Sequence, residues 1–143
     1  MTLATIDSAL AIVAKHPDRA FFAGPRPEKL IVQAELALGG SLPPSYRRFV
    51  ERLGAGSFGS AEVYGIIEEP FDGPVPDAVW ITIEEREGGS IPHNMIIVGD
   101  SGDGSYYCLQ QGEDGPVFLL ETNGNSAVAA AGFGQYLLSR FAS

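Results

Sequence analysis

The chain has 143 residues, 45% of them hydrophobic and 19% charged, which fits one globular domain over residues 1–143 and excludes a disordered chain. Residues 1–60 hold seven Lys or Arg and five Asp or Glu, a net +2, whereas residues 61–143 hold two Arg and thirteen Asp or Glu, a net −11. An acidic surface of this kind repels nucleic acid and favours a basic protein partner, although net charge also serves solubility.

The cysteine content and the N-terminal segment indicate in which cellular compartment the protein is expected. The single cysteine, Cys108, excludes an internal disulfide and suits a reducing environment. The apolar N-terminal segment lacks the basic start of a signal peptide and is too short to span a bilayer. We therefore expect a cytoplasmic protein with no membrane contact, whose oligomeric state the sequence leaves open.

Three amphipathic helices are predicted in the first 54 residues, at residues 3–16, 27–38 and 43–53, with residues 21–25 as a connector. Proline at or next to the boundaries and glycine after the second and third helices set their ends. The third helix places four apolar residues on one face and its charged residues on the other. The four apolar residues are Tyr46, Phe49, Val50 and Leu53.

Residues 54–59 match the glycine pattern G-x-G-x-x-G of dinucleotide sites. In such a site the loop leaves a strand and opens a helix, so that the pyrophosphate meets the helix N-terminus. Here a helix precedes the glycines and a strand is predicted after them, at residues 63–67. The pattern therefore indicates a helix cap and a loop, and no cofactor is expected.

Residues 78–87 fit either a strand or a helix, because apolar residues alternate there but also recur at helical spacing. A turn-rich loop precedes this stretch. Asp77 is a suitable N-cap, and Gly88 with Gly89 would end a helix. We predict a helix.

Three short strands follow, at residues 94–99, 105–110 and 116–121, separated by turns rich in Asp and Gly. This spacing predicts an antiparallel meander. Ser126 is a possible N-cap for a last helix, whose inner face would carry Phe133, Leu137 and Phe141. The predicted fold class is α+β: N-terminal helices, a mostly antiparallel sheet and a C-terminal closing helix.

Catalytic and metal patterns are incomplete. Gly99–Gly102 repeats the letters around a serine-protease nucleophile, but a hydrolase using Ser101 or Ser57 would need a base and an orienting carboxylate that no spacing supplies. One cysteine and two distant histidines make no zinc site, and the aspartates near residue 100 lack calcium-loop spacing. We expect no metal, and Cys108 as a small buried hydrophobe.

The order of motifs resembles the SUKH superfamily, in its Smi/Knr-type branch, which is named for a yeast regulator of cell-wall synthesis. The similarity runs from about Leu30 onward. Its front half rests on Ala34-Glu35, Leu38-Gly39, Leu42-Pro43, Tyr46, Phe49-Val50 and Val63-Tyr64-Gly65. Its back half rests on residues 96–100, Gly102, Gly104, residues 106–109, Pro116-Val117, Phe133 and Tyr136-Leu137.

This resemblance implies an α+β fold without catalysis, and a role like that of the many bacterial members that neutralise a toxin domain, often a nuclease. One position departs from the family pattern: Ser105 stands before the paired tyrosines, where an acid or Asn is frequent, and Asp103 comes earlier. That departure puts in doubt any role for a carboxylate of this turn.

The leading hypothesis is a non-enzymatic immunity protein that binds a basic toxin domain through its acidic half. The alternative is a general intracellular interaction or regulatory module without a toxin partner. Trp80, the sole tryptophan, is either a core residue or an exposed interface anchor. The residues expected to bind the partner are Glu68, Glu69, Asp72, Asp77, Trp80, Glu84, Glu85 and Glu87.

Overall fold

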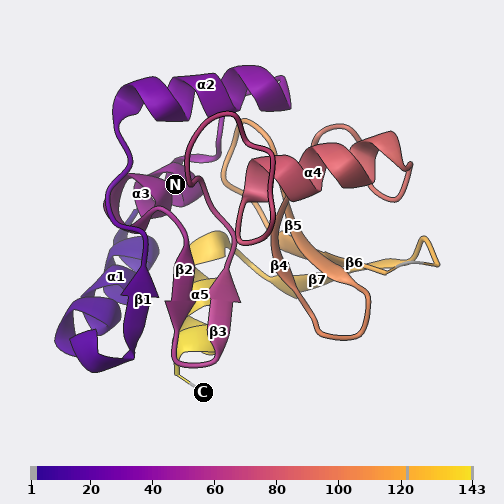
Figure 1. Ribbon diagram of the computed structural model, residues 1–143. Helices are drawn as coiled ribbons and strands as arrows, with labels where there is room; N and C mark the ends of the chain where they lie inside the picture. The colour runs from indigo at the N-terminus through magenta and orange to yellow at the C-terminus, as the bar shows by residue number, and fades with distance from the viewer. Residues whose placement is uncertain (1–2, 122, 143) are drawn as a thin grey trace.

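The computed structural model describes residues 3–121 and 123–142 (Figure 1). These residues form an α+β fold of helices and two antiparallel sheets. The helices are α1 (Ala4–Lys15), α2 (Glu28–Leu38), α3 (Pro44–Leu53), α4 (Ala78–Glu87) and α5 (Phe133–Phe141), with a short 3-10 turn at Pro17–Arg19. The strands are β1 (Ala20–Phe22), β2 (Gly56–Phe58), β3 (Ala61–Val63), β4 (Met95–Asp100), β5 (Tyr106–Gln110), β6 (Val117–Leu120) and β7 (Ser126–Ala130).

The three N-terminal helices lie where the apolar spacing predicts them. Each buries one face, and the fully buried aromatic residues Tyr46 and Phe49 come from α3. Gly39 ends α2 with φ of 81°, a left-handed conformation that glycine adopts without the strain a side chain would cause. The predicted helix at 78–87 is also confirmed, as α4. The Asp77 side chain caps its first turn by accepting a hydrogen bond of 3.0 Å from the backbone N–H of Trp80.

The predicted meander is confirmed as the four-stranded sheet β4-β5-β6-β7, in which every neighbouring pair is antiparallel. The second sheet, β1-β2-β3, corrects two expectations. The connector at residues 21–25 begins inside β1, and the glycine-rich loop contains β2. Gly56 allows this pairing, since a Cβ there would lie 2.1 Å from the carbonyl oxygen of Phe21.

Two further expectations about boundaries are wrong. The strand predicted at residues 63–67 is β3, which ends at Val63, after which Tyr64 continues toward β4. Ser126 caps no helix: it opens β7, which pairs with β6, and the last helix begins only at Phe133. Alanine favours helix intrinsically, but pairing with a neighbouring strand overrides so weak a preference.

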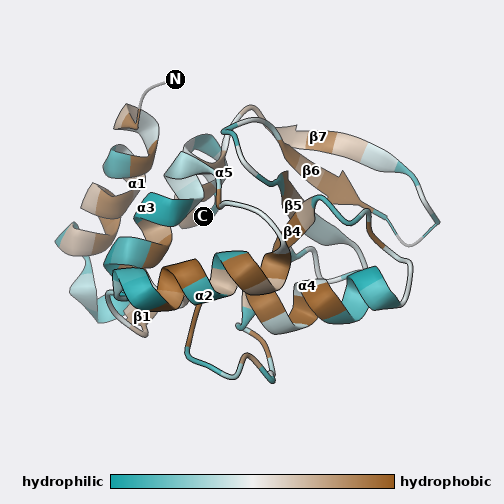
Figure 2. Ribbon diagram, turned by 90° about the horizontal axis from the view of Figure 1, so that it is seen from above, coloured by the Kyte–Doolittle hydropathy of each residue, from teal (hydrophilic) through white to brown (hydrophobic). Residues whose placement is uncertain are grey.

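The helices cover both faces of the larger sheet (Figures 1 and 2). On one face, Ile97 and Cys108 pack with Ala78 and Ile81 of α4 in a small second core. The opposite face contributes to the main core, which also contains the buried sides of the other four α-helices. Within residues 3–121 and 123–142, no helix has the length and apolar character needed to cross a membrane.

The two sheets meet beside the end of β4, and this contact places the candidate site. The backbone N–H of Tyr64 donates a hydrogen bond of 2.9 Å to the carbonyl oxygen of Val98 in β4. Gly65 then forms a parallel bridge with Asp77, at the start of α4. The loop between these two residues is thus held at both ends while its middle extends outward.

Candidate functional site

A groove of about 480 Å³ lies between β3, the turn after β4, the loop before α4 and the end of α5. It carries two carboxylates and one guanidinium group. Its lining residues are Ser60, Glu62, Tyr64, Val75, Asp100, Gly102, Gly104 and Arg140. We call this feature the acidic groove.

Local structure fixes the two carboxylates of the acidic groove. In β3, Ala61 and Val63 are buried, so strand alternation turns Glu62 between them outward. Asp100 is the exposed last residue of β4, and its Oδ1 accepts a hydrogen bond of 2.6 Å from the backbone N–H of Gly102. The contact between Tyr64 and Val98 brings the two strand ends together.

Tyr64 lines the acidic groove together with these carboxylates and is only 4% exposed. Burial raises the pKa of its hydroxyl to about 12, and the negative charges of Asp100 and Glu62 add to the effect. Both carboxylates therefore add to the negative potential at the Tyr64 hydroxyl.

The negative potential continues from the acidic groove to α4. The Tyr106 hydroxyl donates a hydrogen bond of 3.4 Å to Oε2 of Glu85. Burial raises the pKa of Tyr106, as do Glu85 and, more weakly, Asp100. Glu85 is half-buried, whereas Glu84 and Glu87 on the same helix are exposed.

The loop before α4 supplies the remaining acids. A hollow of about 240 Å³ beside it is lined in part by Glu68 and Asp72, and Glu69 is exposed next to them. Val75 lines both this hollow and the acidic groove. We use the name acidic surface for the following eight residues: Glu62, Glu68, Glu69, Asp72, Glu84, Glu85, Glu87 and Asp100.

Two residues expected to bind a partner also have structural contacts within the chain. Asp77 is 4% exposed and caps α4, so its carboxylate is turned away from solvent. Burial, as the main cause, raises the pKa of Asp77. Trp80 is half-buried, and its indole packs so closely on Gly73 that a Cβ there would lie 2.5 Å from Cδ2. Core packing thus accounts for much of the Trp80 side chain.

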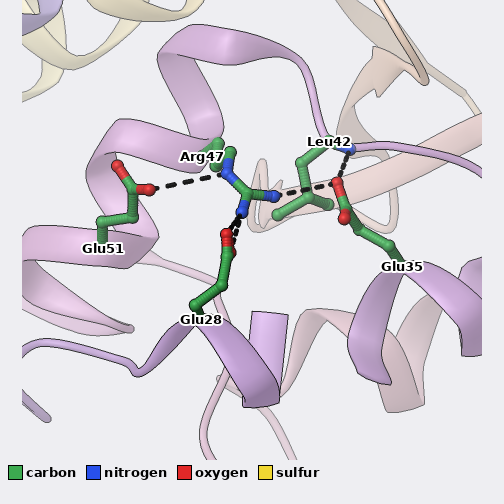
Figure 3. A network of polar contacts seen from close by, with 5 residues as sticks. All are labelled: Glu28, Glu35, Leu42, Arg47 and Glu51. Carbon is green, nitrogen blue, oxygen red and sulfur yellow. Dashed lines mark hydrogen bonds and ion pairs between the residues drawn. The ribbon is translucent and has the colours of Figure 1, made fainter. Parts of the chain in front are cut away.

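Ion pairs neutralise four of the five acids of residues 1–60 but not those of the acidic surface. Arg47 contacts Glu28, Glu35 and Glu51 between α2 and α3 (Figure 3), and Arg48 contacts Asp7. No other ion pair joins two described side chains. The thirteen acids of residues 61–143 therefore have no such partner, although two arginines lie in the same part of the sequence.

Those two arginines make other contacts. Arg86 is 9% exposed and donates hydrogen bonds to the carbonyl oxygens of Leu38 and Met95 and to the side chain of Gln111. The guanidinium of Arg140 lies 5.5 Å from the ring centre of Tyr107 and 5.8 Å from that of Tyr136. Neither arginine offsets the charge of the acidic surface through a direct ion pair.

Local geometry favours turns and caps over catalysis at the serine and glycine motifs. Ser101 donates hydrogen bonds to Asp103 and to the carbonyl oxygen of Ser105, within the turn after β4. Gly54 ends α3 and a β-hairpin follows, so the glycine pattern does not open a helix. The described part of the chain holds no group of three His, Cys, Asp or Glu suited to a metal ion. What the surface offers chemically is attraction for cations.

Sequence reasoning missed four residues of the acidic groove: Glu62, Tyr64, Asp100 and Arg140. Glu62 had a usable signal, because it stands alone between the apolar residues Ala61 and Val63, as an outward residue of a strand does. The nearness of Glu62 to Asp100 depends on contact between the two sheets. No short-range pattern contains that information.

One known protein family matches nearly the whole chain. The family model SUKH_5, described as SMI1-KNR4 cell-wall, matches residues 12–142. No curated protein sequence matches the chain. The match includes every helix and strand after the start of α1, together with the acidic groove. The chain therefore belongs to the SMI1-KNR4 family of SUKH proteins.

Proposed function

We propose that the protein is a non-catalytic immunity protein, which binds and neutralises a cognate bacterial toxin domain through the acidic surface. Membership of the SUKH family supports a role in protein binding. The observation that carries the proposal is the excess of −11 in residues 61–143, whose acids take no part in the ion pairs between described side chains.

The physical argument concerns the charge of the partner. Enzymes that cleave nucleic acids bind a polyanion, so a nuclease toxin presents a basic surface where its substrate enters. An unpaired acidic surface attracts such a partner over a distance and speeds the encounter. Covering the substrate-binding surface would also block the toxin. The protein would then act in the cytoplasm, where the toxin arrives.

We expect the residues of the acidic surface and the apolar residues beside it to contribute to binding in different ways. Glu68, Glu69 and Asp72 extend from the loop before α4, and Glu84 and Glu87 are exposed on α4 itself. Exposed acids of this kind mainly raise the association rate. Val75, which is 36% exposed, and the half-buried Trp80 can add apolar contact area at the same surface.

The test is titration calorimetry with the toxin domain encoded beside this gene, at low and at high salt. We expect tight binding that weakens with salt, because ions screen exposed charges. Replacing Glu68, Glu69, Glu84 and Glu87 by Lys should reduce the association rate at least tenfold at low salt. A control replaces the exposed residues Asp18 and Glu113 by Lys, and the variant that replaces only Glu84 and Glu87 by Lys matches it in charge. Unchanged binding in the first variant would show that the acidic surface is not the contact.

The second candidate is a regulatory interaction module without a toxin partner, and the cell-wall description of the matching family favours it. Gene context separates the two functions cheaply. A large secreted toxin gene next to this one supports the immunity role, whereas a housekeeping operon supports the regulatory role. Failure to bind any neighbouring toxin domain would also favour the second candidate.

A further inference from the structure

The larger sheet has one covered edge and one open edge. The covered edge is β4, where the carbonyl oxygen of Met95 accepts a hydrogen bond of 3.0 Å from Arg86 and the N–H of Ile97 donates one of 2.9 Å to the Thr82 hydroxyl. The other edge is β7, the last strand in the order, whose residues 126–129 are exposed (Figure 2). No described residue makes a comparable contact with the outer side of β7.

The hydrogen-bond pattern shows which backbone groups of β7 are unpaired. The N–H of Glu121 donates a hydrogen bond of 2.8 Å to the carbonyl oxygen of Asn125, beside the connection from β6 to β7. Along an antiparallel pair, residues that bond to the neighbouring strand alternate with residues that do not. Ala127 is therefore bonded to β6, whereas the N–H and C=O groups of Ser126 and Val128 point away from the sheet.

The open edge of β7 lacks the features by which proteins usually prevent pairing between edges. Such strands commonly carry Lys, other charges or proline. Residues 122–139 contain no Asp, Glu, Lys, Arg or Pro, and Val128 is 63% exposed. A register shift follows Val128, so the regular open stretch is confined to residues 126–128. The edge is thus short, uncharged and defined in register.

We infer that β7 pairs antiparallel with β7 of a second copy of this chain, about a two-fold axis at Ala127. This axis places Ser126 of each copy opposite Val128 of the other, so the outward N–H groups of one copy donate to the outward C=O groups of the other. Ala127 faces its own counterpart in a non-hydrogen-bonded pair, where side chains come closest and a methyl group fits. The edge is therefore complementary to itself, as a two-fold interface requires.

Charge favours a second copy over a basic partner at this edge. Each copy carries a net charge of −9, so two copies repel each other in most orientations. That repulsion is least where β7 meets β7, because residues 122–139 carry no charged side chain. A basic partner finds no opposite charge on β7 and is attracted to the acidic surface instead. Because the β4 edge is covered, pairing through β7 ends at the dimer.

Analytical ultracentrifugation of the full chain tests for the dimer. The contact is small, so we expect a dissociation constant on the order of 100 µM. The dimer fraction should rise with protein concentration between about 10 µM and about 1 mM. It should also rise with salt, because salt screens the repulsion between the copies. A monomer over the whole range would overturn the inference, and a dimer that salt dissociates would be held by opposite charges at another surface.

Substitutions on the two-fold axis test the register. Ala127→Lys and Ala127→Glu each place like charges opposite one another, so each variant alone should be monomeric. A mixture of the two variants should dimerise again, because opposite charges then meet across the axis, and misfolding could not be rescued in this way. Ala14→Lys and Ala14→Glu, at an exposed position of α1, are the matched controls and should dimerise like the natural protein. A mixture that stays monomeric would refute pairing at Ala127.

Amide hydrogen exchange, followed residue by residue, locates the interface. Raising the protein concentration should slow exchange at Ser126 and Val128, whose N–H groups become paired, and should leave Ala127 unchanged because β6 already protects it. A dimer in which exchange at Ser126 and Val128 stays fast would use another surface and would refute the inference. None of these measurements involves a toxin, so the dimer and the proposed function can fail separately.

Discussion

Arg47 in α3 and Glu35 in α2 form an ion pair in which Nη1 lies 3.2 Å from Oε2, and the backbone N–H of Leu42 donates a 2.8 Å hydrogen bond to the same oxygen. Figure 3 shows this carboxylate between the guanidinium and the chain that connects the two helices. Glu35 thus satisfies a backbone donor just before α3 and also pairs with a charge on α3. It sets the position of α2 against α3.

Glu35→Ala should lower the free energy of unfolding by about 1–3 kcal/mol, because the part-buried N–H of Leu42 loses its acceptor. Glu35→Gln keeps an acceptor oxygen and should cost less. Urea denaturation measures both. The control is Glu28→Gln, because Glu28 also contacts Arg47 but its side chain is 64% exposed. Equal losses for Glu35→Ala and Glu28→Gln would contradict this role.

Arg86 joins three separate parts of the structure from the buried side of α4. Its guanidinium donates a hydrogen bond of 2.7 Å to the carbonyl oxygen of Leu38 at the end of α2, and others to Met95 and Gln111. Arg86→Met should destabilise the fold by at least about 2 kcal/mol, since buried carbonyl groups lose their donors. Arg86→Lys should recover only part of this, because an ammonium lacks the planar set of donors.

Thermal and urea denaturation of these two variants provide the measurement. The exposed Arg52→Met, on the outer side of α3, is the matched control and should change the free energy of unfolding little. If Arg86→Met were as stable as Arg52→Met, the hydrogen bonds of Arg86 would be dispensable.

Asp77 should give the stability a distinctive pH dependence. Burial raises its folded-state pKa above that of the unfolded chain, so protonation favours the folded state. Asp77→Asn keeps the N-cap without the buried charge and should be at least as stable as the natural protein at pH 7. That advantage should shrink as the pH falls toward about 4, the pKa of Asp in an unfolded chain.

Asp77→Ala removes the cap altogether and should cost about 1 kcal/mol at pH 7. Denaturation of the three proteins between pH 4 and pH 7 measures both effects. A constant difference between Asp77→Asn and the natural protein over this range would show that the Asp77 pKa is not raised.

Sequence patterns predicted the elements whose signals are local. The helix at 78–87 had an N-cap before it and glycines after it, and α3 had four apolar residues on one face. The short strands β1, β2 and β7 had no such signal. Their residues are mainly Gly, Ala, Ser and Phe, and only pairing with distant strands makes them β-structure.

Some residues of the candidate site could also be predicted from local sequence signals, and others could not. Glu84 and Glu87, both expected to bind a partner, are exposed on α4, whereas Asp77, expected to do the same, is buried. Its value as an N-cap, which the sequence did indicate, explains why it is buried. Glu62 and Asp100 meet only because Tyr64 bonds to β4, and that contact joins residues 34 positions apart in the sequence.

The thiol of Cys108 should be unreactive in the folded protein. It lies in β5 against α4 with no exposed surface, and burial raises the pKa of its thiol to about 12. Thiolate is the reactive form, so almost none is present at neutral pH. Ellman's reagent should therefore react with the native protein at pH 8 only as fast as the structure opens. Rapid labelling without denaturant would contradict this environment, and Cys108→Ala supplies the blank.

The urea dependence of the labelling makes the test sharper. If the second core must open to expose the thiol, the labelling rate should rise along the same curve as global unfolding measured by circular dichroism. Labelling that begins at lower urea would mean that α4 detaches from the sheet before the main core unfolds. Glu85 and Tyr106, whose hydrogen bond joins α4 to the sheet, would then separate in that early step, and Tyr106→Phe should make early labelling easier.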